Sequence, residues 1–169
     1  MLVLFAGCDQ AFGLERDEVV LVCPASFREV GGAYYRRVDD TLTWHQAEAA
    51  CEALSEPETT GQTHLAVIAR DDELAAVIGN LTITGFWLGH TDLATDGTFV
   101  PTTPQSVTWP TSAMPPWAVG QPNNNGGNQD CLWVDGNGLL DDRGCTSDND
   151  KARFVCECDL FPSTAPLPP

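Results

Sequence analysis

The first part of the chain alternates between extended and helical patterns of hydrophobic residues. Residues 19–23 are apolar and β-branched, and residues 34–38 follow a Gly-Gly turn, so both segments predict strands. Over residues 44–54 the hydrophobic positions recur at helical spacing, and Thr43 with Gln46 has the sequence of a capping box. A helix is therefore predicted there, with one buried stripe formed by Trp44, Ala47, Cys51 and Leu54.

Regular patterns continue as far as residue 89. Residues 64–68 predict a short strand, and residues 85–89 predict a buried strand. Between them, Asp71 or Asp72 caps a second predicted helix, which stops near residues 79–80. The hydrophobic positions of this helix are Leu74, Ala75, Val77 and Ile78.

Periodicity is lost from about residue 91 to residue 130. A connection of this length inside one domain is typical of a functional loop. Strand patterns return at residues 131–134 and 153–156. The order of strands, two helices, a strand, a long loop and further strands predicts an α+β fold, with the helices packed on an antiparallel sheet.

Length and composition fit a single folded domain. The 169 residues suit one domain better than two, and 43% of them are apolar. We assign residues 19–160 to the domain, residues 1–18 to a signal remnant or lipid-anchor tether, and residues 161–169 to a Pro-rich disordered tail. The net charge of −16 would repel nucleic acid and anionic bilayers, whereas carboxylates suit hard cations such as calcium.

The sequence carries no motif for enzymatic chemistry. It has no Gly-x-Ser-x-Gly elbow and no glycine-rich loop that opens a helix and cradles phosphate. Adjacent carboxylates such as Asp141 and Asp142 do not form an acid/base pair across a substrate. A binding protein is therefore favoured over an enzyme.

The seven cysteines favour disulfides and an oxidising compartment. They form no Cys-x-x-Cys pair, and the three histidines are scattered, so a structural zinc site is a poor fit. An odd number leaves one thiol to explain. The cysteines are Cys8, Cys23, Cys51, Cys131, Cys145, Cys156 and Cys158.

The first residues offer a role for the odd cysteine. Residues 1–7 are apolar or small and are followed by Cys8, which resembles the end of a bacterial lipoprotein signal. This pattern favours a bacterial protein, secreted or lipid-anchored through Cys8 at the cell surface. The alternative is a frayed apolar terminus with a stray thiol. No stretch is long enough to span a bilayer, so any contact with a membrane would run through lipid.

Several short motifs occur in an order that resembles the C-type-lectin-like domain, over roughly residues 23–157. The resemblance implies an α+β fold with two helices, small antiparallel sheets, a long loop region and two to three disulfides. The matching segments are residues 44–54, 64–68, 85–89, 117–123, 131–145 and 154–157.

The resemblance also implies which cysteines pair. Cys51 with Cys156 would tie the first helix to the last strand, and Cys131 with Cys145 would pin the loop that carries the binding site. In the family's fold the first and last strands are neighbours, so we predict Cys23–Cys158 as the third bridge.

The same resemblance implies a calcium site in which a cis proline at position 122 turns two amide side chains to one side. The backbone carbonyl of Asp142 would add a further oxygen, and calcium takes 6–8 oxygen ligands. The implied metal ligands are Gln121, Asn123, Gln129, Asp141 and Asp142. Positions left open would take water or two sugar hydroxyls, and the residues implied to bind the sugar are Gln121, Asn123, Gln129 and Asp141.

Four positions depart from the family's pattern. Gln129 stands where the family usually has Glu, and Leu140 stands where it has Trp. Gln121 with Asn123 combines the mannose-type and galactose-type motifs, so the sequence does not name the sugar. Fewer carboxylates should mean weaker calcium binding.

Two other readings remain open. Residues 121–129 also suit a polar, flexible loop, in which case the domain would be a calcium-independent scaffold that binds a protein partner. Asp130 with Asn124 is a weaker candidate for a second cation site.

Overall fold

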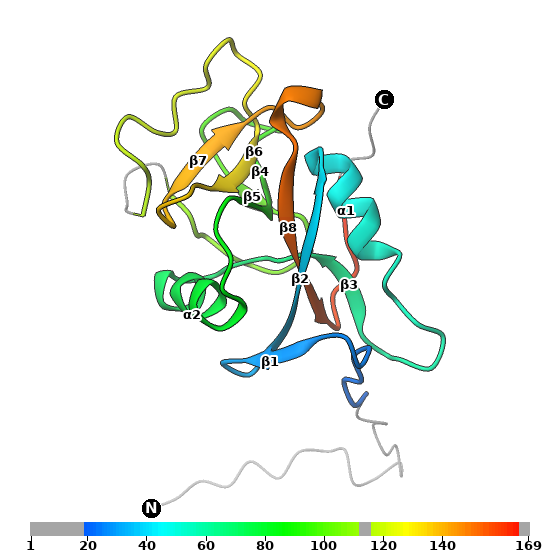
Figure 1. Ribbon diagram of the computed structural model, residues 1–169. Coiled ribbons are helices and arrows are strands. Elements are labelled where there is room, and N and C mark those ends of the chain that lie inside the picture. Colours follow the sequence, from blue (N-terminus) through cyan, green and yellow to red (C-terminus); the bar gives the residue numbers. More distant parts are fainter. Residues whose placement is uncertain (1–18, 112–115, 166–169) are drawn as a thin grey trace, which may run out of the picture.

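The computed structural model describes residues 19–111 and 116–165, which fold around one sheet of eight strands in the order β1-β2-β8-β4-β6-β7 (Figure 1). Strand β3 pairs with β8, and β5 pairs with β4. The strands are β1 (Arg28–Val30), β2 (Ala33–Leu42), β3 (Gln62–Leu65), β4 (Phe86–Thr91), β5 (Val100–Pro101), β6 (Cys131–Val134), β7 (Leu140–Arg143) and β8 (Ala152–Asp159).

Strand β8 is the centre of the sheet although it is the last strand of the domain. It pairs with β2 and β3 in antiparallel fashion and with β4 in parallel fashion. Its residues Ala152 and Phe154–Glu157 are buried, in agreement with a strand that has neighbours on both edges. The α+β class predicted from the sequence is confirmed. The sheet was predicted to be antiparallel, but strands β4 and β8 pair in parallel.

The two helices supply separate core clusters. Helix α1 (Trp44–Glu52) buries Trp44, Ala47 and Cys51, and Thr43 N–H donates to Gln46 Oε1 (3.2 Å) as the predicted capping box requires. Helix α2 (Asp71–Leu81) buries Leu74 and Val77 in the other cluster. Within the described residues, neither helix is long and apolar enough to cross a membrane.

Some boundaries differ from the sequence prediction. Residues 19–23 are not a strand, because the backbone of Val22 is bound instead to the 60–61 turn, where Thr60 N–H and Gly61 N–H both donate to its carbonyl. Helix α2 has Arg70 rather than an aspartate at its N-cap. It runs on to Leu81, beyond the predicted stop at residues 79–80, and its C-cap is the left-handed Thr82 (φ 50°).

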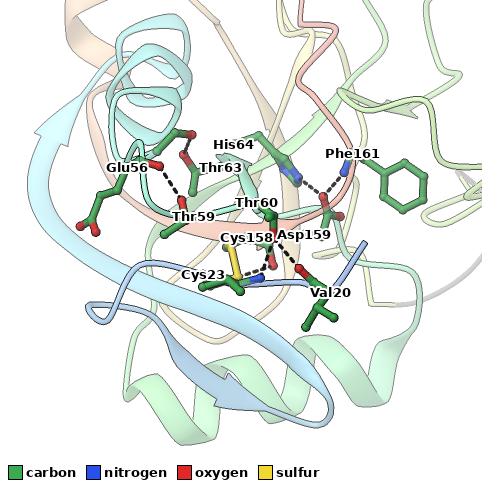
Figure 2. The surroundings of a disulfide bond; sticks show 12 residues. Val20, Cys23, Glu56, Thr59, Thr60, Thr63, His64, Cys158, Asp159 and Phe161 are labelled. Atoms are coloured by element: carbon green, nitrogen blue, oxygen red, sulfur yellow. Dashed lines mark hydrogen bonds and ion pairs between the residues drawn. A yellow bond between two sulfur atoms is a disulfide. The ribbon is translucent and has the colours of Figure 1, made fainter. Parts of the chain in front are cut away.

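The structure contains the three disulfides that were predicted, Cys23–Cys158, Cys51–Cys156 and Cys131–Cys145. The first two join the N-terminal part of the domain to β8, and each such bridge typically contributes about 2–4 kcal/mol. Figure 2 shows Cys23–Cys158 beside the turn at Thr59 and Thr60. Cys8 and the rest of residues 1–18 lie outside the described residues.

The segment after β8 continues along the domain surface. Ser163 Oγ donates to the carboxylate of Glu48 on α1, and Thr164 Oγ1 donates to the carbonyl of Thr102 (2.9 Å). Residues 161–165 of the segment assigned to a disordered tail are therefore in hydrogen-bonded contact with the fold, and residues 166–169 lie outside the described range.

Three carboxylates, two of them buried, bind the backbone of residues 65–69, where β3 ends and the chain turns towards α2. Every second N–H of this extended segment is bound by a glutamate from a different element, in place of a neighbouring strand. The pairs are Leu65 N–H with Glu48 (2.9 Å), Val67 N–H with Glu157 (2.9 Å) and Ala69 N–H with Glu73 (2.7 Å).

His64 lies fully buried beside this segment, and an oxygen acceptor faces each of its two ring nitrogens. Its Nδ1 is 2.8 Å from the carbonyl of Leu65 and its Nε2 is 3.2 Å from the carboxylate of Asp159, and both partners are acceptors (Figure 2). Burial lowers the pKa of His64, but Asp159, the charge of Glu157 and the Leu65 carbonyl raise it to about 9 in total. Burial raises the pKa of Glu157, against the opposing effect of His64.

We predict that His64 makes the domain less stable at alkaline pH. Because its pKa is higher in the folded state than in the unfolded chain, the contribution is complete below about pH 6.5 and is lost as the pH rises to about 9. In His64→Gln the free energy of unfolding should fall by about 2–3 kcal/mol at pH 6, and its decline between pH 6.5 and 9 should flatten. Urea unfolding over that pH range measures both.

His45→Gln is the matched control, because burial lowers the pKa of His45, the opposite direction to that of His64. Between pH 6.5 and 9 its free energy of unfolding should decline as steeply as that of the wild type. A His64→Gln protein that also keeps the wild-type slope would show that His64 is neutral in the fold.

Candidate functional site

The long loop between β4 and β6 begins and ends at one place. Asp92 N–H, directly after β4, donates to the carbonyl of Asp130, directly before β6 (3.0 Å). The Cys131–Cys145 bridge then ties the end of the loop to the segment after β7. Amide-rich residues 121–130 are thereby held against strand β7, which carries the twin aspartates.

Asp142 fastens the amide-rich segment to β7. Its side chain is almost fully buried, and its carboxylate accepts the N–H of Asn123 at 3.0 and 3.1 Å and the N–H of Asn124 at 2.5 Å. The peptide bond between Gln121 and Pro122 is cis. Two regions that lie 18–19 residues apart in sequence thus meet, as the resemblance implied.

Gln129 closes the segment on itself. Its Oε1 accepts the N–H of Asn125 (2.7 Å), and its own N–H donates to Oδ1 of Asn124 (3.1 Å). Asn124 has a positive φ of 41°, which places its side chain in this local ring. The amide oxygen of Gln129 is therefore partly engaged by backbone, and Asn123, in contrast, has an exposed side chain.

Two of the candidate ligand oxygens are buried and unpartnered. Oε1 of Gln121 and Oδ1 of Asp141 have no hydrogen-bond partner among residues 19–111 and 116–165. Burial raises the pKa of Asp141, while Arg143, 3.4 Å from its other oxygen, lowers it. A buried acceptor without a donor costs about 1–3 kcal/mol. A bound cation is one way to satisfy a buried oxygen of this kind, and amide and carboxylate oxygens are ligands that calcium prefers.

A second acidic group surrounds the base of the loop. Oδ2 of Asp92 accepts the N–H of Gly97 (2.7 Å), and its Oδ1 is buried without a partner in the described part of the chain. Burial, with the charges of Asp130 and Asp96, raises the pKa of Asp92 to about 6. Burial, with the charges of Asp96 and Asp142, also raises the pKa of Asp130.

Sequence reasoning named Asp130 and Asn124 for a second cation but missed Asp92 and Asp96. The signal was present, because Asp92 directly follows a buried strand and Asp130 directly precedes one. Because strands β4 and β6 pair, the two ends of the loop between them must meet. The carboxylates of Asp92 and Asp130 are therefore expected to lie close together.

The family model of the lectin C-type domain matches residues 40–158, and the chain belongs to this family. It is 30% identical to the hepatic lectin of Gallus gallus over 148 residues, which cover 84% of this chain and 64% of that protein. It is also 30% identical to asialoglycoprotein receptor 2 of Rattus norvegicus over 140 residues, which cover 80% of this chain and 42% of the receptor. The chain thus spans less than two thirds of the length of these relatives.

Solved structures agree on the fold. The lectin CEL-I from Cucumaria echinata superposes with a TM-score of 0.65 at 23% identity, covering 82% of this chain and 98% of that one. A calcium-independent type II antifreeze protein gives a TM-score of 0.60 at 21% identity, covering 85% and 98%. The C-type-lectin fold predicted from the sequence is confirmed.

The relatives named above come from animals, and they give no support to the bacterial, lipid-anchored protein that residues 1–8 suggested. Because those residues lie outside the described ranges, the lipidation of Cys8 stays a prediction from sequence.

We predict that substitutions of the two neighbouring aspartates change the stability of the protein by different amounts when no cation is present. Asp142→Asn removes a carboxylate that accepts two backbone N–H groups, so with a chelator the free energy of unfolding should fall by about 1–3 kcal/mol. Asp141→Asn, whose Oδ1 has no partner in the described structure, should change it by less than about 1 kcal/mol. Urea unfolding with EDTA measures the difference, and equal losses would contradict the assignment of roles.

Proposed function

We propose that the domain is a calcium-dependent carbohydrate-binding module of an exported protein. The observation that supports it best is the pair of buried, unpartnered oxygens on Gln121 and Asp141, which no other group in the described residues satisfies. The three disulfides favour an extracytoplasmic location. The relatives described as a hepatic lectin and an asialoglycoprotein receptor add weight to sugar binding.

The calcium ligands in this proposal are the five residues drawn from sequence, Gln121, Asn123, Gln129, Asp141 and Asp142, with the carbonyl of Asp142. Calcium bound there would supply open coordination positions for two neighbouring hydroxyls of a sugar. Gln121, Asn123, Gln129 and Asp141 would then hydrogen-bond the same hydroxyls, since amide groups both donate and accept.

Calcium affinity should be low. Only Asp141 and Asp142 are carboxylates among the five side chains, and the carboxylate of Asp142 already accepts hydrogen bonds from two backbone N–H groups. Affinity rises with the number of charged ligands, and sites of extracellular modules reach dissociation constants of about 10⁻⁴–10⁻³ M. The −16 net charge of the chain partly offsets this by attracting cations.

The alternative is a calcium-independent scaffold that recognises a protein partner through the same loop. The small number of carboxylates favours it, and so does the likeness in fold to a calcium-independent antifreeze protein. The backbone N–H of Asn125 already donates to Oε1 of Gln129, which is consistent with this alternative.

A calcium titration separates the two proposals. If calcium binds only the folded state, 10 mM calcium should raise Tm by about 3–8 °C over the value in EDTA, while the same concentration of magnesium should have little effect. Calorimetry should give a dissociation constant near 10⁻⁴–10⁻³ M. No shift and no heat at 10 mM would leave the protein-binding scaffold.

Asp141→Asn should weaken calcium binding about tenfold or more while the protein stays folded, because it removes one of two charged ligands. Asp148→Asn is the matched control, since Asp148 is an exposed aspartate that pairs with Lys151 (2.9 Å) and is not one of the proposed ligands. Binding to a panel of immobilised monosaccharides should be weaker for Asp141→Asn than for the wild type and Asp148→Asn when calcium is present. With EDTA, binding should be lost in all three proteins. Retention by sugar resins that survives EDTA would contradict calcium dependence.

A further inference from the structure

The outer face of the β6–β7 pair carries an arginine that the calcium site does not account for. In the register of these strands Trp133 lies opposite Asp141 and Cys131 lies opposite Arg143. Since side chains alternate between the two faces of a strand, Trp133, Asp141 and Arg143 emerge on the same face. Asp142, the residue between Asp141 and Arg143, binds the amide-rich segment through its carboxylate.

The three side chains form a stack. The guanidinium carbon of Arg143 lies 3.7 Å from the centre of the Trp133 ring, and Nε of Arg143 lies 3.4 Å from Oδ2 of Asp141. Arginine over the face of an indole is held by the ring quadrupole as well as by packing. The indole N–H of Trp133 is buried and has no partner within the described residues, so the ring contributes to this stack through its face.

The stack divides the two oxygens of Asp141. Oδ2 faces the guanidinium, whereas Oδ1 is the buried oxygen left without a partner. A carboxylate can bind calcium through one oxygen or through both. With Oδ2 paired to a fixed cation, Asp141 is restricted to the one-oxygen mode, and the positive charge next to the site opposes a second cation.

We propose that Arg143, stacked on Trp133, is a positioning residue that presents only Oδ1 of Asp141 to calcium and weakens calcium binding through its charge. The consequence is one more coordination position for water or for a sugar hydroxyl. This inference rests on the calcium site proposed above. Arg143 touches neither the ion nor the sugar in this account and acts through Asp141.

Europium luminescence tests the proposal, because Eu³⁺ replaces calcium and its lifetimes in H₂O and D₂O count the coordinated waters. The excitation line that Asp141→Asn removes identifies the site. In Arg143→Met, which lacks both donor and charge, Asp141 should bind through both oxygens and the number of waters should fall by about one. In Arg143→Gln, which keeps a donor, the number of waters should stay as in the wild type.

Calcium affinity then separates charge from position. Both variants should bind calcium roughly three- to tenfold more tightly, because a unit charge near a divalent ion is removed and salt screens part of the effect. Lys151→Met, which removes a cation paired with Asp148, should leave both readouts unchanged. Unfolding in EDTA shows that each variant is folded.

The failures are distinguishable. A wild-type protein that binds neither Eu³⁺ nor calcium overturns the proposed function and this inference with it. A wild-type protein that binds both ions, alongside an Arg143→Met protein with the same water count and the same affinity, overturns the role of Arg143 alone.

Discussion

Backbone N–H groups that no neighbouring strand can reach must find another acceptor, and in this domain side-chain carboxylates provide it. Glu48, Glu157 and Glu73 bind alternate N–H groups between residues 65 and 69, and Asp142 binds those of Asn123 and Asn124. The first set fixes the path from β3 to α2, and the second fixes the long loop on β7. Irregular chain is thereby held in place without extra secondary structure.

The two uses have different consequences for charge. Around His64, both ring nitrogens have an oxygen partner, and the nearby carboxylates of Asp159 and Glu157 raise the pKa of the imidazole. Around Asp141 the only cation nearby in the described structure is Arg143, which covers one oxygen and leaves the other open. The first arrangement is closed and serves the fold, whereas the second is incomplete and suits a ligand. That contrast supports a ligand-binding role for the residues of β7 and a role in stabilising the fold for the cluster around β8.

Much of the fold was accessible from sequence, because helical spacing and runs of buried residues are local signals. Helix α1, its capping box and strand β4 follow directly from such patterns. Strand β7 does not, since Leu140–Arg143 is mostly polar and is a strand only because β6 lies beside it. Residues 19–23 show the reverse error, since this apolar, β-branched run was predicted to be a strand and is not one. The carbonyl of Val22 is instead bound by the N–H groups of residues 60 and 61.

The candidate site was accessible to a smaller degree. The five proposed ligands were found through a motif, but their states depend on contacts that no local pattern encodes. Gln129 is engaged by Asn125, and Asp141 is shared with Arg143 through a register across two strands. The acidic group at Asp92 and Asp130 did leave a sequence signal, because the two residues flank buried strands that pair with each other.

The position of β8 also shapes how the domain is made. A ribosome or a translocation channel releases residues 152–159 after everything they pair with, yet those residues fill the middle of the sheet. Until they emerge, β2, β3 and β4 each lack a partner along one edge, and Cys23 and Cys51 lack theirs. The nascent domain therefore carries open strand edges and unpaired cysteines until β8 emerges.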